Sequence, residues 1–189
     1  MSRGGGKHYQ PMRNDLGRLL RQESGADVRF TTMFDLYGLY RSFPGWDDAE
    51  KQRHIPHERV LTLERALAAD VADHRFIPYI QLHEFEAILL CEPGHFALEY
   101  ENSDAGVAAL KAAVIAATSP ELVNDGETTA PSKRIAIQFP QYIGQKTTIG
   151  VELAQCVGID TTRSLCPHFD RWLKTLESLG SSPGGSTAS

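Results

Sequence analysis

Apolar and polar positions follow two different spacings along this chain, one typical of helices and one of strands. Helical spacing predicts helices over residues 10–23, 47–74, 83–91, 104–117, 131–139, 151–158 and 169–179. Two runs rich in β-branched and aromatic residues, VRFTTMF at 28–34 and RFIPYIQL at 75–82, predict strands. Helices and strands alternate in the first half, and only helices follow, which predicts an α/β fold with an all-helical C-terminal extension.

The long helical segment between the two strands predicts that they pair in parallel. Two strands are few for a parallel sheet, which needs cover on both faces and usually has several members. We therefore expect further strands from irregular segments, or from a part that this chain lacks. The predicted division is an N-terminally incomplete α/β core over residues 1–100, a helical extension over 101–179 and a disordered tail over 180–189.

The composition is that of an ordinary globular protein, with 41% hydrophobic and 23% charged residues. No apolar run approaches the roughly 20 residues of a membrane helix, so no membrane association is expected. The three cysteines are odd in number and far apart, which argues against a disulfide framework. These features predict a protein of the reducing cytoplasm.

Positive charge is concentrated near the N-terminus. Residues 1–29 carry a net charge of +3 and include Lys7 and Arg13, whereas the rest of the chain carries −8. A basic segment of this kind can contact a phosphate backbone. The alternative is a solvated, amphipathic helix face.

Acidic residues stand where both predicted strands end. Asp35 follows the first strand, and His83, Glu84 and Glu86 follow the second. Open α/β sheets place their sites beyond the carboxyl ends of their strands, so Asp35 with Glu84 or Glu86 would make an oxygen site suited to Mg²⁺ or Mn²⁺. If a helix begins at His83, then His83 and Glu86 share one face and Glu84 points elsewhere. Alternatively, the glutamates are first-turn acids favoured by the helix dipole, and Asp35 is a loop or capping residue.

The segment APSKR at 130–134 is a second candidate site. Pro131 suits a first helical turn, so the amides of Ser132 and Lys133 would lie at a helix N-terminus, where a phosphate can bind. The side chains of Lys133 and Arg134 add positive charge. An ordinary helix start is the alternative.

Four segments in the same order, TTMFDLYGL, FIPYIQLHEFEAILL, NDGETTAPSKRI and CPHFDRWL, resemble the family catalogued as domain of unknown function 4276. The resemblance covers about residues 3–179. Members of that family look like Toprim-type domains, related to the RloB-like and overcoming-lysogenization-defect nucleases. Such proteins are commonly paired with an AAA or ABC-type ATPase, often in bacterial defence against phage. The resemblance thus implies a partial Toprim-like parallel sheet.

A Toprim site, as the resemblance implies, uses a glutamate after the first strand and an Asp-x-Asp after a later one, with Mg²⁺. Asp35 matches the first aspartate, but Tyr37 stands at the second position, where Glu84 or Glu86 would compensate. The first-strand glutamate has no counterpart, and the segment that carries it would precede RGGGK.

The resulting hypothesis is a Toprim-like nuclease subunit that depends on Mg²⁺ or Mn²⁺ and works with an ATPase in antiviral defence. Its metal ligands would be Asp35 with Glu84 or Glu86, and His83 would carry protons or support the site. Nucleic acid is the expected substrate, with DNA and RNA both open, and an oligomer is compatible with the hypothesis. The alternatives are a non-catalytic scaffold subunit of the same complex and another phosphotransfer enzyme.

Overall fold

The computed structural model describes residues 9–123, 126 and 128–180. Lys7 and the predicted tail beyond Gly180 lie outside the described residues. The helices are α1 (Tyr9–Gln22), α2 (Trp46–Lys51), α3 (Pro56–Val71), α4 (Asp104–Ala117), α5 (Pro131–Gln138), α6 (Tyr142–Gln145), α7 (Ile149–Val157), α8 (Ile159–Leu165) and α9 (Pro167–Ser178). The strands are β1 (Phe30–Thr31), β2 (Phe34–Asp35), β3 (Phe76–Ile77) and β4 (Ile80–Gln81). This confirms an α/β fold of short parallel strand pairs with flanking helices and a helical C-terminal region.

Each of the two predicted strands is broken into two short ones. β1 pairs with β3 and β2 pairs with β4, both in parallel, as the long connection between them predicted. The prediction of continuous strands is wrong, because Pro78 at the break has no amide hydrogen for a ladder bond. Beside this break the Tyr79 amide donates a hydrogen bond to the Thr32 hydroxyl at 3.2 Å. A side-chain acceptor thus takes the place of a backbone carbonyl in the ladder.

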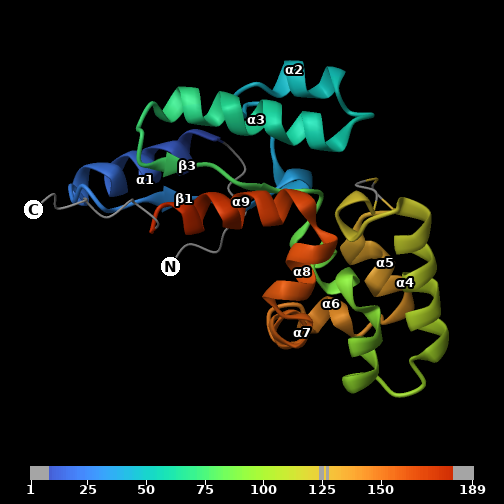
Figure 1. Ribbon diagram of the computed structural model, residues 1–189. Coiled ribbons are helices and arrows are strands. Elements are labelled where there is room, and N and C mark those ends of the chain that lie inside the picture. The colour runs from blue at the N-terminus through green and yellow to red at the C-terminus, as the bar shows by residue number, and fades with distance from the viewer. Residues whose placement is uncertain (1–8, 124–125, 127, 181–189) are drawn as a thin grey trace, which may run out of the picture.

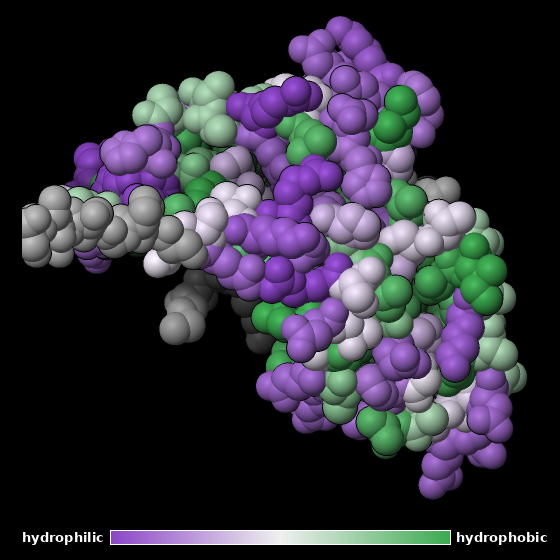
Figure 2. All heavy atoms as spheres, in the orientation of Figure 1, coloured by the Kyte–Doolittle hydropathy of each residue, from purple (hydrophilic) through white to green (hydrophobic). Residues whose placement is uncertain are grey.

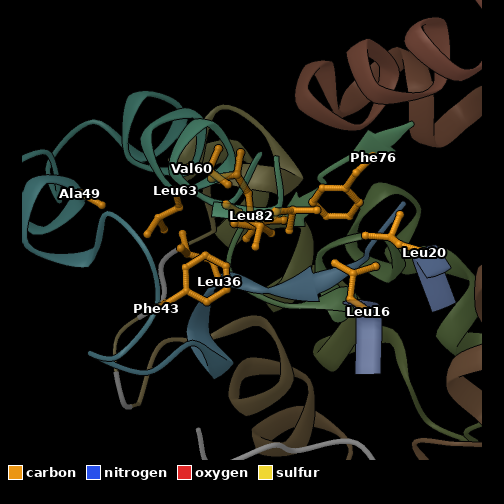
Figure 3. Close-up of a cluster of buried hydrophobic side chains, with 12 residues drawn as sticks. Leu16, Leu20, Leu36, Phe43, Ala49, Val60, Leu63, Phe76 and Leu82 are labelled. Atoms are coloured by element: carbon orange, nitrogen blue, oxygen red, sulfur yellow. The ribbon is translucent and has the colours of Figure 1, made fainter. Parts of the chain in front are cut away.

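Helices cover the strands from two sides (Figure 1). On one side lies α3, whose Leu63 and Leu67 are fully buried in a cluster that also contains Leu36 and Leu82 (Figure 3). On the other side α9 places Trp172 in a stack on Tyr79, with ring centroids 4.4 Å apart. Apolar cover on both faces is what parallel strands require.

The helical segment predicted over residues 47–74 is two helices. α2 ends at Lys51 and α3 begins at Pro56, where proline suits a first helical turn. Gly45, just before α2, has φ +75°, and an added Cβ would lie 2.6 Å from the Cβ of Ala66. A glycine there lets the loop after β2 pack directly against α3.

The prediction of a helix over residues 83–91 is wrong. His83 has φ +62°, in the left-handed region, and Glu84 is extended. Only short 3₁₀ turns follow, η2 (Phe85–Ala87) and η3 (Leu89–Cys91). His83 and Glu86 therefore do not share a helix face, because the chain reverses at His83 before any helical turn begins.

The C-terminal region agrees more closely with the sequence pattern. α4 covers the predicted residues 104–117, although Ser103 and not Asp104 takes the capping position. Gly158, with φ +74°, follows the last residue of α7. A second apolar cluster forms here around Phe96 and Phe139, whose rings stack at 5.0 Å. No helix in the described part of the chain is both long and apolar enough to cross a membrane.

Candidate functional site

Three carboxylates meet at the point where β2 and β4 end. Asp35 is the last residue of β2 and is in register with Gln81 of β4. The chain then turns, and the Phe85 amide donates a hydrogen bond to Oδ1 of Asp35 at 2.9 Å. This bond joins the end of the first predicted strand to the segment that carries Glu84 and Glu86, which the order of strands led us to expect.

His83 forms the turn between β4 and these glutamates. Its carbonyl oxygen accepts a hydrogen bond from the Tyr37 amide at 2.9 Å, and its side chain is buried at 3% exposure. The backbone of His83 thus fixes the loop after Asp35 to the turn before Glu84. His83 makes this connection in a backbone conformation that few non-glycine residues adopt.

Glu84 reaches the N-terminus of α5. Its Oε2 accepts a hydrogen bond from the Ser132 amide at 2.8 Å, and the residue is buried. The sequence predicts a phosphate site at this helix start, but the Ser132 amide already donates its hydrogen bond to the Glu84 carboxylate. The Lys133 amide bonds to the Ala130 carbonyl, and Arg134 bonds to the carbonyl of Thr129. The helix start therefore helps to build the acidic site.

Glu86 faces a lysine that the sequence pattern did not single out. Its Oε1 lies 2.9 Å from Nζ of Lys146, the residue after α6, and Glu86 itself is buried. Tyr142 lies one turn earlier, and burial, followed by the charge of Glu86, raises the pKa of Tyr142. Neither residue carries a recognisable motif, because their contact with Glu86 is made by tertiary packing between distant segments.

Asp35 carries the clearest electrostatic signature of the site. Burial, and then the charges of Glu86 and Glu84, raise its pKa to about 6. The Phe85 amide and Lys146 act in the opposite direction but do not offset the rise. Negative charge thus exceeds local positive charge here, which is a common property of functional sites.

The donor set fits a hard divalent cation held by few protein ligands. Carboxylate oxygens are the ligands that Mg²⁺ prefers, and Mg²⁺ usually binds one or two carboxylates and keeps several waters. Among residues 9–123, 126 and 128–180, no group of three or more His, Cys, Asp or Glu side chains is arranged to hold a metal ion. A two-carboxylate site made by Asp35 and Glu86 agrees with both statements, whereas three protein ligands do not.

Arg13, the other predicted phosphate ligand in the described residues, is occupied elsewhere. Its Nε lies 2.7 Å from Oδ2 of Asp70, and a second nitrogen donates to the Asp70 carbonyl. These contacts tie α1 to the end of α3. The structure thus gives Arg13 a role in helix packing and does not bring it to the carboxylates.

A family model described as "Domain of unknown function (DUF4276)" matches residues 2–177. The chain belongs to the DUF4276 family. This confirms the resemblance found in the four sequence segments. Neither the curated proteins nor the solved structures gave a significant match. The matched range of the DUF4276 chain includes all three carboxylates and Lys146.

Proposed function

We propose that this DUF4276 chain is a metal-dependent nuclease subunit that hydrolyses phosphodiester bonds at Asp35, Glu84 and Glu86. One observation carries the proposal: the half-buried Asp35 and the buried Glu84 and Glu86 gather beyond the carboxyl ends of parallel strands, where open α/β folds place their sites. Membership in DUF4276 supports it through the nuclease relationship that the family resemblance implies.

The contacts of each residue indicate its role in the proposed site. Asp35 and Glu86 would hold Mg²⁺ or Mn²⁺, which when bound neutralises phosphate charge and activates water. Lys146, next to Glu86, brings positive charge to the bound phosphodiester. Glu84 holds the start of α5 through the Ser132 amide, so it positions the wall of the site more than it binds the ion.

The wider setting is part of the same proposal. A Toprim-type relationship, an AAA or ABC-type ATPase partner and a role in antiviral defence are supported by the family resemblance. The prediction that the cysteines lie far apart is wrong for two of them, because the buried thiols of Cys91 and Cys166 lie 3.4 Å from each other. A cytoplasmic location is supported by the odd number of cysteines and by their free thiols.

Cleavage assays test the catalytic assignment. The purified chain is incubated with labelled DNA and RNA in Mn²⁺, and we expect Asp35→Asn and Glu86→Gln each to lower the rate by about 100-fold or more, the scale for loss of one strong transition-state interaction. Glu152→Gln, an exposed acid on α7, is the matched control and is expected to retain the wild-type rate. Equal rates in the wild type and both site variants would show that the chemistry does not occur at these carboxylates.

A second candidate function is a non-catalytic scaffold of the same complex. The observation in its favour is that each carboxylate already has a protein donor, Phe85 for Asp35, Ser132 for Glu84 and Lys146 for Glu86. On that account the acids only join β2, α5 and α6. A scaffold has no need to bind a divalent ion, so metal binding separates the two functions.

A further inference from the structure

A polar hollow of about 440 Å³ lies beside the residues that follow Asp35 in the chain. Its wall begins with Leu36 and Tyr37, the two residues that follow Asp35, and continues onto α2 and α3. Ligand pockets commonly have volumes of about 300–1,000 Å³, so this hollow has room for a unit the size of one nucleotide. Hydrophilic residues gather over this end of the molecule, where α2 lies (Figure 2).

Aromatic rings are available in the hollow. Tyr37 lies in the 3₁₀ turn η1 (Leu36–Gly38) and is 42% exposed. Trp46, the first residue of α2, is half-buried, and the Arg59 guanidinium lies 5.8 Å from its ring centroid. An exposed ring backed by fixed neighbours provides a surface on which a flat base can stack.

Positive charge surrounds these rings. Arg41, Arg53 and Arg59 line the hollow together with two acids, Asp47 and Glu50, so its lining carries a net charge of about +1 on an otherwise acidic chain. Arg59 is buried and ion-pairs with Glu50 at 2.6 Å, and Glu50 also lies 3.7 Å from Arg53. Glu50 thereby orients two guanidinium groups. The side chains of Arg41 and Arg53 remain exposed to solvent, where they can meet an anion.

We propose that this hollow binds one nucleotide of a single-stranded nucleic acid, with its base on Tyr37 and its phosphates on Arg41 and Arg53. Arginine is well suited to phosphate oxygens because its planar group donates several hydrogen bonds. A base can reach Tyr37 only when it is unstacked, which favours single strands over duplexes. The inference rests on the proposed nuclease function and gives that site its substrate class. The hollow adjoins the carboxylates, since the amide of Tyr37 in its wall donates a hydrogen bond to the carbonyl of His83, the residue before Glu84.

Binding is measured by fluorescence anisotropy with labelled single-stranded DNA, single-stranded RNA and duplex DNA of one mixed sequence, in EDTA. We expect the wild type to bind a single strand, and Arg41→Ala/Arg53→Ala to weaken that binding by about tenfold or more. Tyr37→Ala is expected to weaken it severalfold, whereas Tyr37→Phe keeps the ring and the affinity. The control is Arg18→Ala, an exposed arginine on α1 that removes one positive charge away from the hollow.

The salt dependence supplies a second readout. Each phosphate contact to a single strand contributes about 0.7 to the slope of log K against log salt, so the double arginine variant is expected to lower the slope by about 1.4. Absence of single-strand binding, equal binding by the double variant and Arg18→Ala, or equal affinity for duplex and single strand would each overturn the proposal.

The metal-free conditions keep this test separate from the nuclease proposal. Glu152→Gln, the exposed acid on α7, is expected to bind the strand like the wild type, because it leaves both arginines and Tyr37 in place. A chain that binds single strands but does not cleave them contradicts only the catalytic assignment. A chain that cleaves with unchanged affinity in the double arginine variant contradicts only the assignment of the hollow.

Discussion

Asp35→Asn is expected to make the metal-free protein more stable at neutral pH, by about 3 kcal/mol in the free energy of unfolding. An aspartate in an unfolded chain titrates near pH 3.9, whereas burial and the charges of Glu86 and Glu84 raise the pKa of Asp35 to about 6. Between about pH 4 and pH 6 Asp35 keeps its proton in the folded state and loses it in the unfolded chain. The contribution of Asp35 to the free energy of unfolding is therefore greatest below about pH 4, decreases as the pH rises to about 6 and is lost above that. Asparagine keeps the acceptor for the Phe85 amide without the charge.

Urea unfolding in EDTA at pH 4.5 and pH 7.5 measures this effect. The variant is expected to exceed the wild type clearly at pH 7.5 and much less at pH 4.5, where Asp35 is protonated in the folded state. Asp160→Asn, an exposed acid at the start of α8, is the control and is expected to change stability by less than about 0.5 kcal/mol at both values. A variant that is less stable than the wild type at pH 7.5 contradicts the electrostatic account of Asp35.

Glu121→Ala is expected to lower the free energy of unfolding by about 3 kcal/mol. Glu121 has 0% exposure and lies in the 3₁₀ turn η5 (Pro120–Leu122), far from α9 in sequence. Its two carboxylate oxygens accept hydrogen bonds from the amides of His168 and Phe169 at 3.0 and 2.9 Å. These amides belong to the first turn of α9, so alanine leaves two buried donors without their acceptor and removes a negative charge from a helix N-terminus.

Thermal and urea unfolding measure the loss, with Glu101→Ala as an exposed control expected to stay within about 0.5 kcal/mol of the wild type. Glu121→Gln separates acceptor from charge, since its single carbonyl oxygen replaces one of two acceptors and is expected to give an intermediate loss. If alanine costs no more than the control, Glu121 does not hold the start of α9 against η5.

Sequence patterns located the acidic site because its position follows from topology. Asp35 stands at the end of one β-rich run and Glu84 and Glu86 at the end of another, and parallel pairing brings the two ends together. α4 and α5 could also be predicted from the sequence, since their apolar spacing and helix starts are local properties of the chain. In these places local preference and tertiary structure agree.

The remaining features of the site depend on contacts between distant residues. The left-handed backbone of His83 has no glycine in the sequence to mark it. Lys146 reaches Glu86 from 60 positions away, and Ser132 reaches Glu84 across 48 residues. The apolar spacing of residues 83–91 predicts a helix, but the turn at His83 and the hydrogen bonds of the carboxylates override that local preference.

Glu121 and Asp35 show two different uses of carboxylates in this fold. Glu121 is matched to its donors and stabilises the fold, whereas Asp35 is crowded by other acids and weakens it at neutral pH. Sites that lower stability are commonly retained because they serve function. This contrast supports Asp35 as a functional residue and Glu121 as a structural one.

Calorimetric titration of Mn²⁺ into the purified chain at pH 7.5 tests whether Asp35 and Glu86 hold a divalent ion. We expect saturable binding by the wild type and by Glu152→Gln, and its loss in Asp35→Asn and in Glu86→Gln, because two carboxylates hold the ion. Circular dichroism of each variant verifies that the fold is intact. Absence of binding by the wild type, or unchanged binding in both site variants, would contradict a metal-dependent site at the ends of β2 and β4.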